Sequence, residues 1–301
     1  RGCRVAFFLR AFSSLYAGVN SPLLQLRFFA LTQPRAEIVT TLNRYQPQIV
    51  VGPPSLLAAL AAARQDGILR IKPQRLIAVA EVLEPQDEQL LHQSFGAPIH
   101  QIYQCTEGLL AVSCAHGQLH IQEDLAALQL EPIPGQRDPT EPIHYTPIVT
   151  DLWRTTQPII RYRLGDLLQL SDQPCPCGCC FRVIIAIEGR AGDLCYATHT
   201  DGQRLPLFPA TLRRLVLDSS AAIRDYEIVQ QPDDAFQIYL ATDPAADFGS
   251  IATNVTARVR TALTANGCQP PTMQVTAGIP PRPATAKRRR VQRIQDAPCT
   301  L

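Results

Sequence analysis

Strand-like and helix-like segments alternate at short intervals over residues 47–105, and this alternation limits the folds open to the chain more than any other feature. The expected strands are 47–51, 75–80 and 98–105, and the expected helices are 55–67 and 85–95. Ser55 is expected to cap the first of these helices, and Gly67 lies near its end. This order predicts a parallel α/β sheet, with ligands at the carboxyl ends of its strands.

The rest of the chain departs from this pattern in two steps. Residues 109–170 carry short strands and Pro-rich turns, which predict a β-rich subdomain attached to the sheet. Beyond Gly189 the expected order is strand 194–196, helix 208–217, strands 223–230 and 235–241, helix 248–266 and strand 272–276. This β-α-β-β-α-β order predicts a small ferredoxin-like domain. We therefore expect two domains, residues 1–189 and 190–301.

Charge and cysteine usage narrow the class of protein. The net charge of the 301 residues is +2, which argues against a nucleic acid or an anionic membrane as partner. The apolar N-terminus carries Arg1, Arg4 and Arg10 and has neither the length of a membrane span nor a cleavage site. Ten cysteines without a signal peptide indicate a cytoplasmic protein with reduced thiols.

Residues 155–193 hold three signals close together. RYRLGD ends at Asp166, where a strand that breaks at Gly165 presents a carboxylate able to accept two hydroxyl donors. CPCGCC, at residues 175–180, packs four sulfurs around one Gly. IEGRAGD runs a strand into a Gly-rich bend, where Arg190 offers a cation at a flexible joint.

In this order, P-x-I-R-Y-R-x-G-D, C-P-C-G and I-x-G-R resemble the AMP-forming adenylating enzymes. The nearest branch is that of phenylacetate–CoA ligase, whose relatives include the synthetases that adenylylate a deazaflavin coenzyme. The resemblance implies the C-terminal part of an adenylate-forming large domain (parallel α/β sheet plus β-rich subdomain), followed by a small ferredoxin-like α+β lid domain. It also implies the reaction: ATP, Mg²⁺ and a carboxylic acid, aromatic by family analogy, form an acyl-adenylate, and a thiol such as CoA then accepts the acyl group.

The segment YQCTEG resembles the Y-x-x-T-E element of that family. By this resemblance Thr106 contacts the nucleotide phosphate, Glu107 holds Mg²⁺, and Tyr103 belongs to the nucleotide-binding set. A hydroxyl and a hard carboxylate at a strand end suit phosphate and Mg²⁺. The alternative is Thr-Glu in an ordinary turn, and the position of the motif about sixty residues before RYRLGD favours the functional interpretation.

Further nucleotide contacts are implied by position in the family pattern. Ala80, Glu81 and Val82 lie where the family lines its adenine pocket, although a strand end leading into a helix explains them equally well. Asp166 would bind the ribose hydroxyls, and Arg190 would reach toward the ribose or phosphate. Gly-Asp and Gly-Arg pairs are also common on surfaces, but here both occur in the expected order.

The C-terminal segment IPPRPATAKRRRVQRI resembles the closing P-x-x-x-x-G-K-x-x-R element, with Ala286 in place of the usual Gly. The resemblance makes Lys287 the residue that moves over the α-phosphate during adenylation. The alternative is a basic patch for a nuclear address or a phosphate backbone. The small net charge and the absence of stacking aromatic residues nearby disfavour nucleic acid.

The cysteines support a separate hypothesis of a metal site. The resemblance implies a structural zinc site with four N/S ligands: Cys114, His120, Cys175 and Cys177. With four protein ligands the site would be closed and tetrahedral. His116 is a spare ligand, and Cys179 or Cys180 is a substitute. The alternative is a group of free buried thiols.

Two features depart from the family pattern. The Ser/Thr/Gly-rich phosphate loop is missing from the 301 residues, so we expect the chain to begin after it. Gly192 stands where the family usually has a hinge Asp, although Asp193 follows. A degenerate, non-catalytic nucleotide- or zinc-binding relative is therefore the alternative function, and the sequence leaves a homodimer open.

Overall fold

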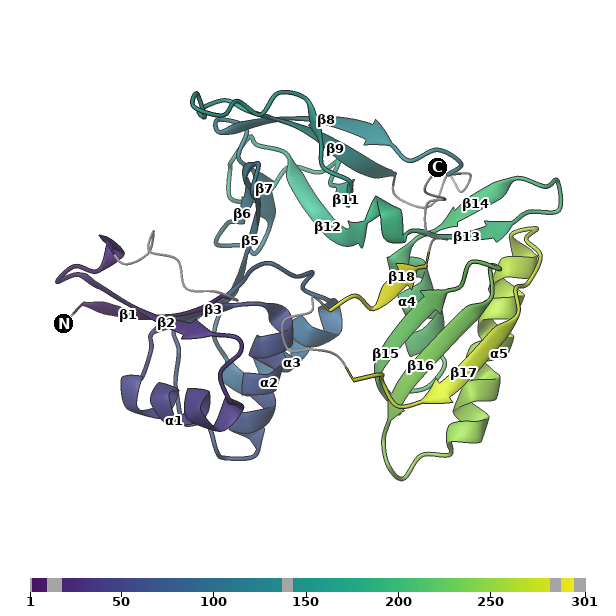
Figure 1. Ribbon diagram of the computed structural model, residues 1–301, viewed down its shortest axis with the longest axis horizontal. Helices are drawn as coiled ribbons and strands as arrows, with labels where there is room; N and C mark the ends of the chain where they lie inside the picture. The colour runs from purple at the N-terminus through teal and green to yellow at the C-terminus, as the bar shows by residue number, and fades with distance from the viewer. Residues whose placement is uncertain (1, 10–17, 137–142, 282–287, 295–301) are drawn as a thin grey trace, which may run out of the picture.

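The computed structural model describes residues 2–9, 18–136, 143–281 and 288–294 (Figure 1). The described residues form a 12-stranded sheet, a two-stranded hairpin and a four-stranded sheet. Three helices accompany the first part of the large sheet, and two more accompany the small sheet on the opposite side of the molecule (Figure 1). The α/β fold class expected from the sequence is confirmed.

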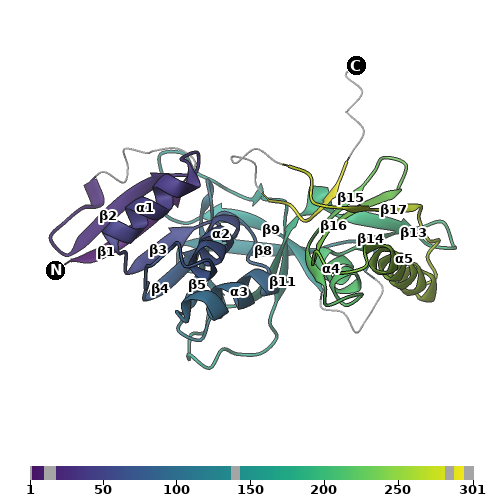
Figure 2. The same ribbon diagram turned by 90° about the horizontal axis from the view of Figure 1, so that it is seen from below.

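The first part of the large sheet is parallel and has the strand order β2-β1-β3-β4-β5. Its strands are β1 (Cys3–Leu9), β2 (Leu24–Ala30), β3 (Ile49–Gly52), β4 (Arg75–Ala78) and β5 (Ile99–Cys105). The helices are α1 (Arg35–Tyr45), α2 (Pro54–Gln65) and α3 (Pro85–Phe95). All three helices cover the same face of this sheet (Figures 1 and 2).

The start of α2 differs from the expectation. The N-cap residue is Pro53, without a side-chain capping bond, and Pro54 occupies the first helical position, where a missing N–H costs nothing. Ser55 therefore lies inside the first turn rather than capping it. Its backbone N–H donates to the Glu81 carboxylate at 3.1 Å, so a neighbouring loop satisfies a helix-end donor.

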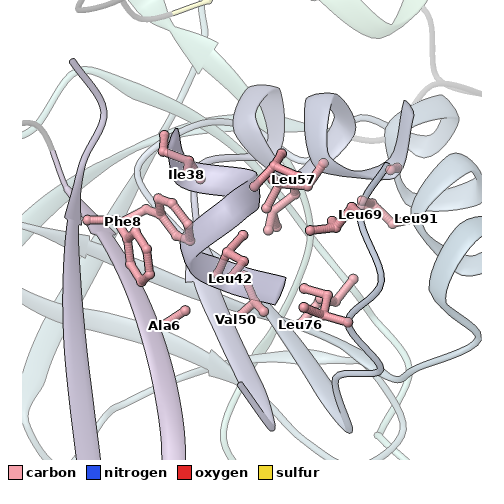
Figure 3. Packing of buried hydrophobic residues seen from close by; sticks show 14 of the residues in the cluster. Ala6, Phe8, Ile38, Leu42, Val50, Leu57, Leu69, Leu76 and Leu91 are labelled. Atoms are coloured by element: carbon pink, nitrogen blue, oxygen red, sulfur yellow. The ribbon is translucent and has the colours of Figure 1, made fainter. Parts of the chain in front are cut away.

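The core of the parallel part lies between the sheet and its helices (Figure 3). Phe8 from β1 stacks on Phe29 from β2 with ring centroids 4.8 Å apart, and both side chains are buried. Leu42, Leu57 and Leu91, one from each helix, are 0% exposed. Burying a leucine of this kind stabilises a fold by about 1.5–3 kcal/mol, so the helical apolar stripes hold the layers together.

The second part of the large sheet is antiparallel and continues directly from the first, because β5 pairs with β4 on one side and with β6 on the other. The further strands are β6 (Gly108–Ser113), β7 (Leu119–Ile121), β8 (Ala126–Pro132), β9 (His144–Asp151), β10 (Tyr162–Arg163), β11 (Asp166–Leu170) and β12 (Val183–Arg190). No helix lies among these strands in the described part of residues 108–190. The expected β-rich subdomain is thus present.

The remaining elements begin with a single 3₁₀ turn, Ala191–Asp193, followed by the hairpin β13 (Cys195–Thr198) and β14 (Arg204–Leu207). The later elements are α4 (Pro209–Leu217), β15 (Ile223–Gln230), β16 (Phe236–Thr242), α5 (Phe248–Ala265), β17 (Met273–Ala277) and β18 (Val291–Arg293). The strand expected at 194–196 lies in the hairpin instead of the small sheet. The fourth strand of that sheet is β18, in the order β17-β16-β15-β18.

The physical reason for this difference lies in β18 itself. The strand has three residues and one buried apolar side chain, Val291, which lies between Arg290 and Gln292. A segment this short and charged has no detectable period, so only its parallel pairing with β15 makes it a strand.

Among the described residues, no helix combines the length and apolar character that a membrane crossing requires.

Candidate active site and metal centre

A cavity of about 1380 Å³ opens at the carboxyl ends of β4 and β5, with residues of β12, α4 and β18 forming further walls. Every described residue that the sequence predicted for nucleotide or Mg²⁺ binding lines this cavity: Ala80, Glu81, Val82, Tyr103, Thr106, Glu107, Asp166 and Arg190. The strand ends thus bring together side chains from four separate segments of the sequence. This is the position at which open α/β sheets bind ligands.

Tyr103, Asp166 and Arg190 form a connected group in the cavity wall. The Tyr103 hydroxyl donates to Asp166 Oδ2 at 2.5 Å, and Arg190 Nε lies 2.9 Å from Asp166 Oδ1. Asp166 is 7% exposed, so these two partners compensate for much of the cost of burying its charge. Burial, reinforced by the neighbouring Asp166 carboxylate, raises the pKa of Tyr103, which therefore stays a neutral donor.

Strand pairing explains why Asp166 and Arg190 meet. They are opposite residues in the antiparallel pair β11–β12, at the end nearest the cavity. Gly165 precedes the pair with φ +73°, a left-handed conformation that favours glycine. Arg190 also donates from Nη1 to the Leu164 carbonyl at 2.9 Å, so its guanidinium is oriented from two sides.

Thr106 and Glu107 lie on the tight turn between β5 and β6. Thr106 is exposed, and its backbone carbonyl accepts a hydrogen bond from Arg154 Nη1 at 2.9 Å. Glu107 is half-buried, and the thiol of Cys105, two residues earlier, donates to the Gly108 carbonyl at 3.7 Å and interacts with the Glu107 carboxylate. Burial, followed by this bond to Glu107, raises the pKa of Cys105 to about 11. The turn therefore presents a hydroxyl and a carboxylate to the cavity, and its thiol stays protonated.

Ala80 and Glu81 form the loop after β4. Ala80 has φ +68°, an uncommon conformation for a residue with a Cβ, and such outliers cluster at ligand sites. Glu81 reaches back to α2, where it accepts the Ser55 N–H described above. This contact ties together two loops at the carboxyl ends of β3 and β4.

Several cavity residues were missed by sequence reasoning. Ser55, Arg213, Arg288, Arg289 and Arg290 all line the cavity. A single Ser or Arg carries no periodic or motif signal, so only the run of arginines after Lys287 could have drawn attention to them. Lys287 itself lies outside the described residues.

The four predicted zinc ligands come together beside the cavity and are not among the residues that line it. Ligand atoms of Cys114, His120, Cys175 and Cys177 all lie within 4.8 Å of one another. Cys114 and His120 flank the β6–β7 turn, and the two later cysteines come from the loop between β11 and β12. Antiparallel pairing of β7 with β12, which sets Val183 opposite His120, brings these two regions together.

The distances fit a tetrahedral zinc ion. Zn–S bonds of about 2.3 Å and Zn–N bonds of about 2.0–2.1 Å imply ligand separations of about 3.8 Å for S···S and about 3.6 Å for S···N. The Sγ atoms of Cys114 and Cys175 are 3.7 Å apart, and Cys177 Sγ lies 3.3 Å from His120 Nε2. The two sulfurs are thus too far apart for a disulfide and spaced for a shared metal.

The surroundings also prepare these atoms for a metal. His120 Nδ1 lies 3.0 Å from the Phe181 carbonyl, which can only accept, so the ring proton sits on Nδ1 and the Nε2 lone pair faces Cys177. Burial opposes ionisation of Cys114, but the N–H groups of His116 and Gln118, with the Cys175 thiol and His120, lower its pKa to about 7; the pKa of its partner Cys175 is raised to about 11 in turn, so the pair holds one thiolate more readily than two. A thiolate at neutral pH is the form that binds a metal.

The spare ligands considered from sequence lie outside the cluster. Cys179 and Cys180 are exposed, and the Cys179 N–H donates to Cys177 Sγ at 3.4 Å, so Cys179 supports a ligand instead of replacing it. His116 is exposed and lines the cavity wall. The described residues therefore single out the four ligands that the resemblance implied.

Comparison with known proteins identifies similar folds, but the sequence identities are low. No protein-family profile matches the chain. Protein CapK of Staphylococcus aureus is 24% identical over 160 residues, which cover 51% of this chain and 34% of CapK. The chain therefore spans only part of the length of this curated relative.

Similar solved structures include several CoA ligases. The 2-hydroxyisobutyryl-CoA ligase in its postadenylation state, in complex with R3-HIB-AMP, has a TM-score of 0.71 and 21% identity, covering 98% of this chain and 66% of the ligase. The anthranilate CoA ligase AuaEII with anthranoyl-AMP has a TM-score of 0.63 and 15% identity, covering 95% and 58%. O-succinylbenzoate CoA synthetase (MenE) of Bacillus subtilis with AMP has a TM-score of 0.55 and 17% identity, covering 97% and 62%.

These likenesses establish the fold, and the resemblance to the AMP-forming adenylating enzymes is confirmed at that level. The chain spans about two-thirds of the length of the 2-hydroxyisobutyryl-CoA ligase. Other states of the same ligase superpose less well, with a TM-score of 0.59 for an open conformation and 0.52 for the thioesterification state. Among these three states, the chain as a whole superposes best on the postadenylation state.

Proposed function

We propose that this chain belongs to an adenylate-forming ligase that activates a carboxylic acid with ATP and passes the acyl group to a thiol such as CoA. The observation that carries the proposal is the cavity at the strand ends, where the group Tyr103–Asp166–Arg190 faces the turn bearing Thr106 and Glu107. Fold likeness alone does not assign a function, so the proposal rests on this group of side chains.

In the first half-reaction, an oxygen of the acid's carboxylate attacks the α-phosphorus of ATP and pyrophosphate leaves. Asp166 accepts the ribose hydroxyls, while Arg190, held against Asp166, contributes positive charge beside the ribose or phosphate. Thr106 donates its hydroxyl to a phosphate oxygen, and Glu107 is the carboxylate that would hold Mg²⁺. Ala80, Glu81 and Val82 form the wall against the adenine.

In the second half-reaction, a thiol attacks the acyl carbonyl and AMP leaves. We place the domain boundary at Gly189–Arg190 and the joint at residues 189–192, so that the part beyond it rotates between the two steps. In the first half-reaction, Lys287 would stabilise the charge that develops on the α-phosphate. The aromatic character of the acid remains a proposal from family analogy.

We further propose that Cys114, His120, Cys175 and Cys177 hold a structural zinc ion. The support is the ligand spacing and the orientation of His120 described above. Four protein ligands leave no open position, so the ion would join the β6–β7 turn to the loop before β12 and take no part in catalysis. Reduced thiols in such a cluster also favour the cytoplasm as the compartment.

The test of the ligase function is ATP–pyrophosphate exchange by the full-length gene product with a panel of aryl and alkyl acids. Exchange with at least one acid that is lost in Lys287→Ala supports the proposal. No exchange with any acid, under conditions where the protein is folded and contains metal, contradicts it. Comparing aryl with alkyl acids tests the aromatic preference separately.

A second candidate is a non-catalytic relative that keeps the scaffold and the metal site. The favouring observation is Gly192, which stands where the family resemblance places a hinge Asp. Calorimetric titration with AMP and with ATP separates the candidates. Binding of neither nucleotide by the full-length product supports the non-catalytic relative.

A further inference from the structure

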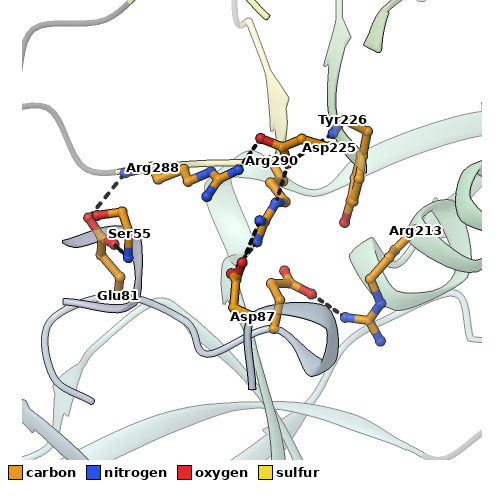
Figure 4. Close-up of polar contacts among 9 residues, drawn as sticks. Ser55, Glu81, Asp87, Arg213, Asp225, Tyr226, Arg288 and Arg290 are labelled. Atoms are coloured by element: carbon orange, nitrogen blue, oxygen red, sulfur yellow. Dashed lines mark hydrogen bonds and ion pairs between the residues drawn. The ribbon is translucent and has the colours of Figure 1, made fainter. Parts of the chain in front are cut away.

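Segment 288–293 docks onto the first turn of α3, although some two hundred residues separate the two in sequence (Figure 4). Arg290 Nη1 lies 2.8 Å from Asp87 Oδ2, and Arg290 Nη2 lies 3.0 Å from Asp87 Oδ1. This is a bidentate pair, the strongest geometry that an arginine and a carboxylate form. Arg290 is 8% exposed and Asp87 6%, so the pair is shielded from solvent.

The contacts of Arg290 extend into the small sheet. Its Nε donates to Asp225 Oδ1 at 3.0 Å, and its guanidinium lies over the ring of buried Tyr226, 5.9 Å from the centroid (Figure 4). Arg288 pairs with the same Asp225, and its backbone N–H points to Glu81 Oε1 at 3.5 Å. We call Asp87, Arg290, Asp225 and Arg288 the latch.

A second contact lies beside the latch and also joins the large sheet with its three helices, here called the large part, to the small sheet with α4 and α5, here called the small part. Arg213 of α4 lies 2.5 Å from Glu84, the N-cap residue of α3 (Figure 4). Arg289 lies 3.0 Å from Asp193 in the 3₁₀ turn that follows β12. Arginines of the small part thus meet carboxylates that belong to the cavity wall or to the connecting turn.

Because the Asp87–Arg290 pair of the latch is buried, the latch affects the free energy of the arrangement of the large and small parts. Separating them would leave Asp87 without its bidentate partner, and the cost of a charged group that loses its partner exceeds that of breaking an exposed pair. The positive end of the α3 dipole favours a negative charge at Asp87 in either arrangement, so this contribution does not discriminate between them. The latch therefore favours the arrangement seen here.

We propose that Asp87 is a positioning residue for the adenylation step: through Arg290 it holds segment 288–293 at the cavity wall and the small part in its postadenylation-like arrangement. The role in the reaction rests on the proposed function, while the effect on arrangement stands without it. The higher similarity to the postadenylation than to the thioesterification structure of one ligase agrees with this assignment. Rotation for the second half-reaction must then break the latch.

The first experiment measures arrangement without any assay of activity. Hydrogen–deuterium exchange is followed by mass spectrometry in the wild type, Asp87→Asn and Arg290→Lys. We expect peptides covering residues 84–95 and 288–294 to exchange about tenfold faster in Asp87→Asn, as loss of a charged hydrogen bond implies. Arg290→Lys, which keeps the charge but loses the bidentate geometry, should fall between the two.

The matched control is Asp243→Asn, which breaks a bidentate pair with Arg224 that lies wholly within the small part. It should leave exchange in both test peptides unchanged. Peptides from α5 (Phe248–Ala265) report whether each variant is folded. Exchange in Asp87→Asn and Arg290→Lys at the wild-type rate, with α5 protected, would overturn the proposal.

The second experiment separates the two half-reactions in the full-length product. In Asp87→Asn we expect the kcat of pyrophosphate exchange to fall about tenfold with little change in the KM for ATP, because the change acts through arrangement. Thioester formation from supplied acyl-adenylate should be unchanged or faster. Equal loss in both half-reactions contradicts a positioning role. If the wild type shows no pyrophosphate exchange with any acid, the proposed ligase function fails. Hydrogen–deuterium exchange then still decides whether the latch holds the arrangement.

Discussion

The hydroxyl of Tyr103 lies 2.5 Å from Oδ2 of Asp166, although 63 residues separate them in sequence. Tyr103 comes from β5, where the parallel part of the large sheet ends, and Asp166 begins β11 in the antiparallel part. This bond therefore connects the two parts of the sheet at the cavity wall. A buried carboxylate with one hydroxyl donor and one arginine is both a structural contact and a ready acceptor for a ligand's hydroxyls.

The first prediction concerns this bond. Tyr103→Phe removes the hydroxyl and leaves buried Asp166 with one donor fewer, so we expect the free energy of unfolding to fall by about 1–3 kcal/mol. Urea denaturation measures it. Tyr162→Phe, at an exposed ring, is the control and should change stability by less than about 0.5 kcal/mol. A Tyr103→Phe variant as stable as the wild type would show that the bond contributes nothing.

The second prediction concerns nucleotide binding. Asp166→Asn keeps the shape of the side chain but loses the charge that pairs with Arg190, so we expect the affinity for AMP in the full-length product to drop at least about tenfold. Isothermal titration calorimetry measures the affinity. Asp243→Asn, which removes an exposed charge paired within the small sheet, should bind AMP as the wild type does. Equal affinity in Asp166→Asn and the wild type would remove Asp166 from the site.

The third prediction concerns the metal. A strong chelator, or Cys175→Ser, should lower the Tm by at least about 5 °C, because an ion bound only by the folded chain stabilises it. Cys180→Ser, at an exposed neighbouring thiol outside the cluster, should leave both Tm and zinc content unchanged. Elemental analysis of unchelated protein gives the stoichiometry. A content below about half an equivalent of zinc would remove the metal hypothesis.

The fourth prediction concerns the pH dependence of a cavity thiol. Burial and the bond to Glu107 raise the pKa of Cys105 to about 11, so at pH 8 only roughly one molecule in a thousand carries the thiolate. Alkylation of Cys105 by iodoacetamide should therefore be slow at pH 8 and rise about tenfold per pH unit up to about pH 10. Peptide mass spectrometry follows each cysteine, with exposed Cys180 as the fast reference. A rate that levels off before pH 9 would contradict the raised pKa.

Local patterns in the sequence were enough for much of this structure. The alternation over residues 47–105 became β3, α2, β4, α3 and β5, because an apolar period of 3.6 or 2 is set by the geometry of the element itself. The four candidate metal ligands were named from the family resemblance, which matches short motifs in the sequence around Cys114, His120, Cys175 and Cys177. The nucleotide-site residues also came from the resemblance, and the expected parallel sheet predicted only that 78–85 and 103–108 lie at strand ends where ligands bind.

What the sequence by itself determined is therefore the set of elements and the chemistry carried by each motif. Only the tertiary structure decided that β18 joins the small sheet, that Ser55 donates to Glu81, and that Arg290 pairs with Asp87. These contacts join segments far apart in the chain, and any of its arginines is chemically suited to pair with any of its carboxylates. The choice among them is made when packed sheets and helices bring two particular side chains together in a buried place, where an unpaired charge would be too costly.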